Sequence, residues 1–268
     1  QDKNLVKKQY YNSHFYNLKN DIFDDLCIFV CSVCGFGYSH PFIDVKKIEY
    51  FYTHEYNQEG GPHYEFKDFK QYNWSKYFSS RFVSQFLIAA QFIELDKVKN
   101  FLDIGANNGE SFSTLNKMGH SPNPYAVEIN EDYVADINDK NLNLILSKDE
   151  NLCLDKKYHN FFDLILMSHV LEHFNANQLD NVLININKIL SKDGVLVVEV
   201  PNDDFRKFYN SENVSPHLTF FSIESLIRLF KKNDFDIMFI NSAGKKKSKK
   251  ESVNQILFQT SKLKVFLK

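Results

Sequence analysis

The sequence has little net charge, no long apolar run and no N-terminal targeting pattern. Its 32 basic and 34 acidic side chains nearly cancel, leaving a formal net charge of -2, so the chain lacks the electrostatic footprint of a nucleic-acid-binding protein. No run approaches the roughly 18 apolar residues that span a membrane, and the first residues lack the pattern of a signal peptide. Nucleic acid and membrane are therefore not expected partners, and the cytoplasm is the expected compartment.

The dinucleotide fingerprint G-x-G-x-x-G is also missing, which argues against a nicotinamide-dependent dehydrogenase. In its place an apolar segment over residues 100–104 runs into a turn that carries Gly105 and Gly109, with Asp103 just before it. Gly105 permits an unusual backbone conformation and a close approach of the backbone to a ligand. The helix expected to begin at Gly109 offers unpaired N–H groups to a carboxylate. The pattern predicts a turn that can hold a nucleoside ligand.

A second acidic residue supports this interpretation. Glu128 ends the next apolar segment, residues 124–128. Open α/β sheets bind ligands at the carboxyl ends of their strands, where an acidic side chain can accept hydrogen bonds from ribose hydroxyls. We expect Glu128 to bind ribose; the alternative is an ordinary solvated loop residue.

Taken together, five segments resemble the class I S-adenosylmethionine-dependent methyltransferases, and the similarity covers roughly residues 80 to 262. The segments are 103–109, Glu128, 147–152, 162–174 and 190–202. The resemblance implies S-adenosyl-L-methionine as cofactor, and an α/β fold with a seven-stranded, mostly parallel sheet, helices on both faces and an antiparallel last strand. The donor-binding residues that it implies are Asp103, Gly105, Asn107, Gly109, Glu128, Ile129, Asp149, Glu150 and Ser168.

Hydrophobic periodicity predicts alternating strands and helices, which gives a parallel sheet covered on both faces. Helices are expected over residues 82–95, 178–190 and 222–232, the last with Ser222 as its cap. The last two strands are expected to pair antiparallel at one edge. The lysine-rich segment 244–250 between them could bind a phosphate group of a substrate or partner, but we interpret it as a solvated loop. The seven strands are expected near residues 100–104, 124–128, 142–146, 162–167, 194–200, 235–240 and 254–260.

Three cysteines near the N-terminus form a separate pattern: Cys27, Cys31 and Cys34, followed by Gly35. A C-x-x-C-G turn is half of a zinc ribbon, and the sugar-modifying methyltransferases that the chain resembles often carry such a ribbon ahead of the catalytic domain. Residues 1–26 hold no cysteine, so the first half of the ribbon is absent. We therefore interpret the segment as a metal-free relic and assign no metal ligand. The residues that could complete a site are Cys27, His14, His40 and His54.

We expect two parts in the chain. Residues 1–78 are predicted to form a small cap of loops and short elements, because residues 1–75 are rich in aromatic side chains without a clear period. Residues 79–268 are predicted to form the donor-binding catalytic domain. Aromatic residues ahead of the first core helix could close over the donor as a lid, or could be the cap's own core. They are Tyr64, Tyr72, Trp74 and Tyr77.

Methyl transfer to a hydroxyl needs a positioned nucleophile and a base, and histidine suits the second role. His217 resembles the histidine of the H-L-x-x-F-S segment in sugar methyltransferases and is our predicted base. His169 and His173 flank Glu172 after the fourth strand. We predict that His169 is catalytic, whereas His173 is expected to tie its loop by hydrogen bonds. Two further candidates, for sugar hydroxyls or a divalent ion, are Asp203 and Asp204.

These observations predict a methyltransferase that acts on a small molecule, by resemblance a nucleotide-linked or otherwise phosphorylated sugar used in surface polysaccharide or a secondary metabolite. Methylation at oxygen is expected. Methylation at nitrogen or on a phosphate-bearing small molecule remains an alternative, as does a donor-binding scaffold subunit without chemistry of its own. Residues 168–171 stand where nucleic-acid methyltransferases carry an Asn/Asp-Pro-Pro-Tyr motif, so a nucleic-acid acceptor is not expected. The sequence assigns no oligomeric state.

Overall fold

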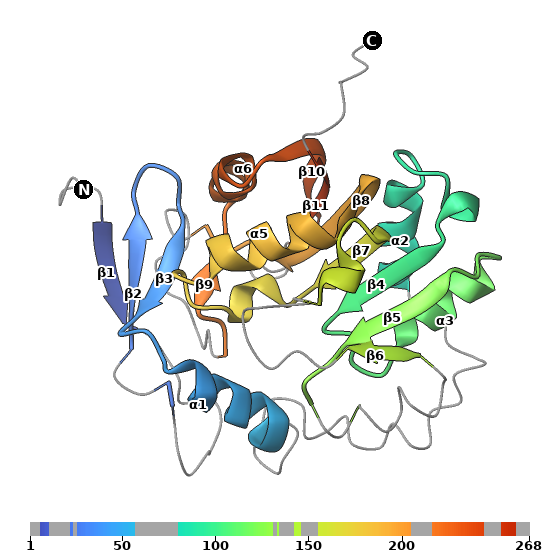
Figure 1. The fold of residues 1–268 in the computed structure, drawn as a ribbon. Helices are drawn as coiled ribbons and strands as arrows, with labels where there is room; N and C mark the ends of the chain where they lie inside the picture. The colour runs from blue at the N-terminus through green and yellow to red at the C-terminus, as the bar shows by residue number, and fades with distance from the viewer. Residues whose placement is uncertain are drawn as a thin grey trace.

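The computed structural model describes residues 6–10, 22–23, 26–56, 80–130, 133, 142–145, 155–204, 216–243 and 253–260. In these parts of the chain the strands form two sheets, a larger one and a smaller one (Figure 1). Among the described helices, none combines the length and the apolar content that crossing a lipid bilayer requires.

The larger sheet carries the predicted α/β fold. Its strands are β4 (Asn100–Ile104), β5 (Asn123–Val127), β6 (Asn143–Ile145), β7 (Phe162–Ser168), β8 (Leu190–Pro201), β10 (Phe235–Ala243) and β11 (Val253–Thr260). They lie in the order β10-β11-β8-β7-β4-β5-β6. The strands from β8 to β6 pair in parallel, so the prediction of an α/β fold with a mainly parallel sheet is confirmed. At the opposite edge β11 runs antiparallel to both β8 and β10.

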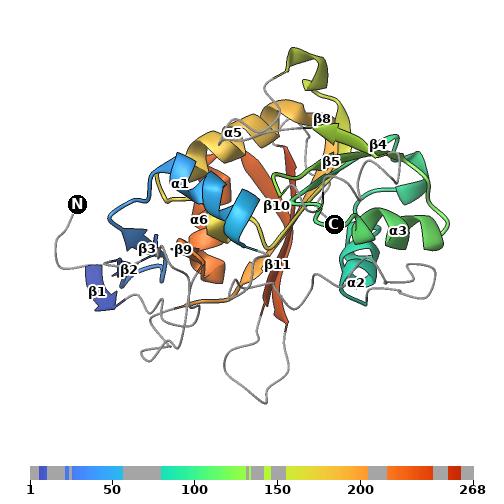
Figure 2. The ribbon, with the colours of Figure 1, turned by 90° about the horizontal axis from the view of Figure 1, so that it is seen from below.

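Helices cover both faces of this sheet. They are α2 (Ser80–Ala89), α3 (Glu110–Lys117), α5 (Leu179–Ile189) and α6 (Ile223–Lys232). The central strands are apolar on both sides, as buried parallel strands must be. In β7, Ile165 and Met167 pack in one cluster with α5 and α6, whereas Leu164 and Leu166 pack in another with α2 and α3. Figure 2 shows the two pairs of helices on opposite sides of the sheet.

Two of the three predicted helices are confirmed to within a residue or so, α5 and α6. Helix α6 begins after Ser222, whose hydroxyl accepts a hydrogen bond from the Ser225 amide at 3.1 Å, while the Ser225 hydroxyl accepts one from the Ser222 amide. This reciprocal cap satisfies amides that have no partner inside the helix. The Ser222 hydroxyl also donates to the Cys34 carbonyl oxygen, which attaches the start of α6 to the cysteine turn.

The predicted helix over residues 82–95 is wrong in its second half, because α2 ends at Ala89. The Phe92 amide bonds back three residues to the Ala89 carbonyl oxygen, and such tight bonds commonly close the last turn of a helix. Leu95 then begins the short 3-10 helix η4 (Leu95–Lys97) and is buried in the same cluster as Phe86. The apolar pattern thus continues beyond the helix that it predicted.

The smaller sheet joins the N-terminal part of the chain to a strand far along the sequence. Its strands, in spatial order, are β1 (Val6–Tyr10), β2 (Cys27–Cys31), β3 (Gly37–His40) and β9 (Thr219–Phe220). In this part of the molecule Ile28, Val30 and Phe51 are buried together with Leu218 and Phe220. This core is shared with the segment around β9, which follows β8 in sequence. The domain division after residue 78 stays a prediction.

Candidate active site

The glycine turn lies at the carboxyl end of β4, in the middle of the larger sheet. The Gly105 and Ala106 amides both donate to the Val127 carbonyl oxygen, at 2.8 and 3.1 Å. Gly105 has a φ of +73°, and a Cβ built on it would lie 2.4 Å from Cγ2 of Val170. Gly109, with a φ of 76°, is the residue that precedes the first turn of α3. Both positions therefore favour glycine for conformational reasons, and at Gly105 a side chain would also clash with Val170.

Glu128 ties this turn to the end of β5. Its Oε2 accepts a hydrogen bond from the Asn107 amide at 2.7 Å, and its Oε1 accepts from the Ile129 and Asn130 amides at 2.9 and 2.8 Å. Burial raises the pKa of Glu128, while these three backbone hydrogen bonds oppose the rise. The structure thus brings the predicted residues Asn107, Glu128 and Ile129 together at the carboxyl ends of β4 and β5.

Asp103 lies inside the protein beneath the turn. Its carboxylate accepts a hydrogen bond from the Ser111 hydroxyl of α3, and the side chain is only 3% exposed. Burial raises the pKa of Asp103 to about 7, against the hydrogen bond from Ser111. Asp103 therefore supports the turn through α3 in this structure.

Several predicted residues lie outside the described part of the chain. They are Asp149 and Glu150 at the predicted adenine border, the aromatic residues Tyr64, Tyr72, Trp74 and Tyr77, and His14. The lysine-rich segment 244–250 lies outside it as well.

Beyond the turn, the end of β7 places polar side chains close to one another. Ser168 accepts a hydrogen bond from Nε2 of Gln85 at 3.1 Å, and the same nitrogen lies 3.0 Å from Oε2 of Glu199. His169 follows with a φ of 57°. Its ring contacts two carboxylates, Nδ1 with Glu172 at 3.1 Å and Nε2 with Glu199 at 3.4 Å. Burial opposes protonation, but these two contacts raise the pKa of His169 to about 9, so the ring is cationic at neutral pH.

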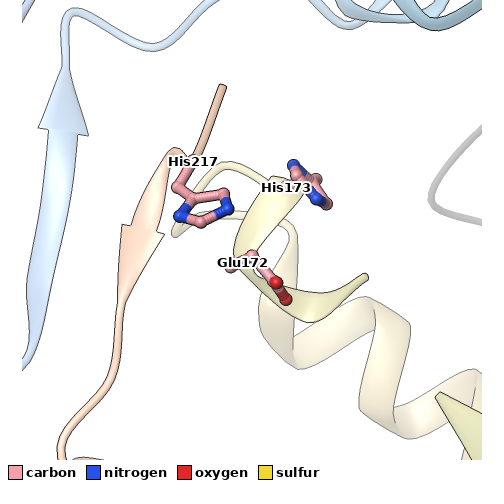
Figure 3. Close-up of side chains that lie close together, drawn as sticks. All are labelled: Glu172, His173 and His217. Atoms are coloured by element: carbon pink, nitrogen blue, oxygen red, sulfur yellow. The ribbon is translucent and has the colours of Figure 1, made fainter. Parts of the chain in front are cut away.

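Glu172, His173 and His217 form a cluster, shown in Figure 3, and Glu172 also contacts His169. One oxygen or nitrogen atom from each residue lies within 4.8 Å of the others. Glu172 and His173 belong to the 3-10 helix η6 (Leu171–His173), which follows β7. His217 precedes β9, and the next amide, that of Leu218, donates to the Glu172 carbonyl oxygen at 2.8 Å. This backbone bond holds the two segments together and brings the predicted His217 to η6.

Burial and the contact with His169 together set the charges of this cluster. Burial lowers the pKa of His217 to about 4 and also lowers that of His173. Burial alone would raise the pKa of Glu172, but the hydrogen bond with His169 lowers it to about 2. The carboxylate is therefore ionised at neutral pH and the two imidazoles are neutral.

Tyr52 is a site residue that the sequence prediction missed. It lies in the π-helix η2 (Phe51–Glu55), which follows α1 (Val45–Tyr50). Its hydroxyl lies 2.6 Å from Nδ1 of His173, and its carbonyl oxygen accepts a hydrogen bond from Nδ2 of Asn130 at 2.9 Å. The segment thus bridges the loop after β5 and the histidine cluster. One tyrosine among many gives no periodic signal that could have revealed this role.

The cysteine turn also carries side chains that could bind a metal ion. Cys27, Cys31 and Cys34 are free thiols. Within the described ranges, neither these thiols nor His40 or His54 belong to a group of three potential ligands. The interpretation of this turn as a metal-free relic stays a prediction.

The buried acid beneath the turn makes the stability of the protein depend on pH. Between about pH 4 and pH 7 the folded protein keeps a proton on Asp103 that the unfolded chain has lost, so the free energy of unfolding falls as the pH rises through this window. We expect Asp103→Asn to remove this loss and to be the more stable protein at about pH 8, by up to about 4 kcal/mol at roughly 1.4 kcal/mol per pKa unit. Urea unfolding of both proteins at about pH 5 and pH 8 measures these free energies of unfolding.

The matched control is Asp236→Asn, since Asp236 is exposed on β10. It should keep the pH dependence of the native protein. An Asp103→Asn variant with that same pH dependence would contradict the assignment.

Comparison with known proteins identifies the family to which the chain belongs. The family model described as a methyltransferase domain matches residues 74–238, more than half of the chain. No curated protein matches the sequence.

Solved structures share the fold at low sequence identity. The PH0226 protein from Pyrococcus horikoshii is 14% identical with a TM-score of 0.52, over 79% of this chain and 95% of that one. The 1,6-didemethyltoxoflavin-N1-methyltransferase of Burkholderia thailandensis, solved with S-adenosylhomocysteine, is 14% identical with a TM-score of 0.55, over 88% and 96% of the two chains. An S-adenosylmethionine-dependent methyltransferase from Clostridium acetobutylicum is 13% identical with a TM-score of 0.51, over 74% and 96%. The chain belongs to the methyltransferase-domain family and is an enzyme that uses S-adenosylmethionine as its cofactor.

Proposed function

We propose that this enzyme methylates a hydroxyl oxygen of a small carbohydrate-type acceptor, a nucleotide-linked or phosphorylated sugar of the kind used in surface polysaccharide. The acceptor oxygen attacks the methyl carbon as its proton passes to His217, and the carbon–sulfur bond breaks with its electron pair staying on sulfur. The observation that carries this proposal is the cluster of Glu172, His173 and His217 next to the glycine turn. A hydroxyl needs activation for this reaction, and the cluster offers polar groups for it.

Two contacts place the cluster beside the turn. Val170, two residues before Glu172, packs directly against Gly105. Tyr52 contacts His173 and, through Asn130, the loop that contains Glu128. A donor held by Gly105 and Glu128 would therefore have its methyl group near the end of β7, and an acceptor would approach from the side of His217.

The surrounding side chains suit an acceptor with several hydroxyl groups. In the described part of the chain, Oε1 of the buried Gln85 has no hydrogen-bond partner. Asp203, whose pKa is raised to about 7 by burial, is electrostatically coupled to Glu172 and His169. Buried polar atoms of this kind are satisfied by polar ligands. They support a sugar over an apolar acceptor.

The donor half of the proposal is tested by replacing one glycine. In Gly105→Ala the added methyl group would meet Val170, so the turn must move, and we expect the affinity for S-adenosylhomocysteine to fall at least about tenfold, or roughly 1.4 kcal/mol. Calorimetric titration measures it. Gly119→Ala is the matched control, because Gly119 also has a positive φ, +94°, but no atom within 4 Å of the added Cβ. Equal affinities in the two variants would contradict the assigned donor site.

The acceptor half is tested by incubating the enzyme with methyl-labelled donor and a panel of phosphorylated and nucleotide-linked sugars, with product analysis by mass spectrometry. We expect an O-methylated sugar. In His217→Ala the rate of its formation should fall about 10²-fold or more, with the affinity for S-adenosylhomocysteine unchanged. The control His120→Ala removes a histidine that pairs with the exposed Asp96 and should behave as the native enzyme.

Two results would contradict this half of the proposal. One is an undiminished rate in His217→Ala. The other is methylation of a ring nitrogen in a non-sugar compound, which needs no activated hydroxyl. Donor binding without methylation of any compound tried would support the scaffold alternative instead.

A further inference from the structure

We propose that Glu172, His173 and His217 together bind one divalent metal cation, which holds and activates the acceptor oxygen. The metal site stands on the geometry of the three side chains. Its part in catalysis rests on the function proposed above.

The chemistry of the three side chains favours a divalent metal cation. One carboxylate and two imidazoles are ligands that suit Mn²⁺, Fe²⁺, Co²⁺ and Zn²⁺. Three protein ligands leave coordination positions open, as in catalytic rather than structural metal sites. A hydroxyl oxygen of the acceptor could fill one of them.

One carboxylate oxygen of Glu172 gives a separate reason to expect a cation. Oε2 of Glu172 is buried and, in the described part of the chain, has no hydrogen-bond partner, in a residue that is only 1% exposed. Its other oxygen is the one that contacts His169, at 3.1 Å. A buried carboxylate oxygen without a hydrogen-bond partner is costly. A cation between this oxygen and the two imidazoles would remove that cost.

The distances among the three ligand atoms are also close to those of a single metal site. The three ligand atoms lie within 4.8 Å of one another. Ligands of a single cation with bonds of about 2.1 Å are roughly 3 to 4 Å apart. A contraction on the order of 1 Å therefore completes the site, which small side-chain rotations can supply.

The neighbouring groups hold the ligands in place and supply charge. The Tyr52 hydroxyl, 2.6 Å from Nδ1 of His173, fixes that ring, so we assign Nε2 to the cation; such outer partners are usual for metal-binding histidines. The backbone bond from Leu218 to Glu172 fixes the carboxylate relative to His217. The buried carboxylates of Glu172 and Glu199, both in contact with the His169 ring, are acidic groups at this site.

The cation would change how the hydroxyl is activated. Bound in an open position, the acceptor hydroxyl has a lowered pKa and releases its proton to solvent. The resulting alkoxide oxygen attacks the methyl carbon, and the carbon–sulfur electron pair remains on sulfur as S-adenosylhomocysteine leaves. His217 then acts as a metal ligand instead of taking the proton itself.

The test uses the full chain, stripped of metal with EDTA and titrated with Co²⁺ without donor or acceptor. We expect one equivalent to bind and to give visible absorption of nitrogen- and oxygen-ligated Co²⁺. In His173→Ala and His217→Ala the affinity for Co²⁺ should fall at least tenfold, while His120→Ala should bind it as the native chain does. Cys31→Ser should also bind as the native chain does, because the thiols take no part. Binding of S-adenosylhomocysteine by each variant reports that it is folded.

A measurement on the native protein needs no variant. The electron spin echo of bound Mn²⁺ should show coupling to imidazole nitrogen. No Co²⁺ or Mn²⁺ binding, binding that survives both histidine substitutions, or a thiolate absorption lost in Cys31→Ser would each overturn the proposal. Any of these with intact S-adenosylhomocysteine binding leaves the proposed function standing. Failure of the native chain to bind S-adenosylhomocysteine refutes that function and not the metal site.

Discussion

The carboxylate of Glu128 is the interaction on which the arrangement of the site depends. It accepts three backbone hydrogen bonds, one from Asn107 in the glycine turn and two from Ile129 and Asn130 after β5. Hydrogen bonds to an ionised acceptor are stronger than neutral ones, and this acceptor is buried. Two loops that leave neighbouring parallel strands are thereby held as one unit. The donor site can be rigid although it consists of turns.

The same unit reaches the acceptor side through the N-terminal part of the chain. Asn130 donates to the backbone of Tyr52, and the Tyr52 hydroxyl contacts His173. Thr53 adds a contact with the Ile129 carbonyl oxygen at 3.4 Å. The π-helix that carries both residues is anchored by Phe51, which is buried in the core of the smaller sheet. The N-terminal part therefore contributes to the site instead of only covering it.

The features that could be predicted from the sequence are those encoded by a local pattern of residues. The strands of the larger sheet follow from apolar runs bounded by polar turns, and Gly105 and Gly109 marked the turn because their backbone conformation favours glycine. Contacts between distant segments left no such signal. The pairing of Gly37 and Tyr38 with the two residues of β9 and the approach of Tyr52 to His173 arise only when the chain is folded.

The role of individual polar side chains was likewise only partly predictable. Asp103 stands where a ligand-binding acid was expected, yet its carboxylate accepts a hydrogen bond from Ser111. Glu172 was noted only as the neighbour of two histidines, because its orphaned oxygen is visible only once burial is known. His217 was found by its motif, but its position beside Glu172 depends on a backbone bond between segments more than forty residues apart.

Binding of the donor by the turn that Glu128 holds can be tested by calorimetric titration of the native protein and Glu128→Ala with S-adenosylhomocysteine, with NAD as the comparison ligand. We expect about micromolar affinity for S-adenosylhomocysteine, no binding of NAD, and an affinity in Glu128→Ala lowered by about 1–3 kcal/mol through the lost charge-assisted hydrogen bonds. Absence of binding to the native protein, or equal affinity in Glu128→Ala, would contradict it.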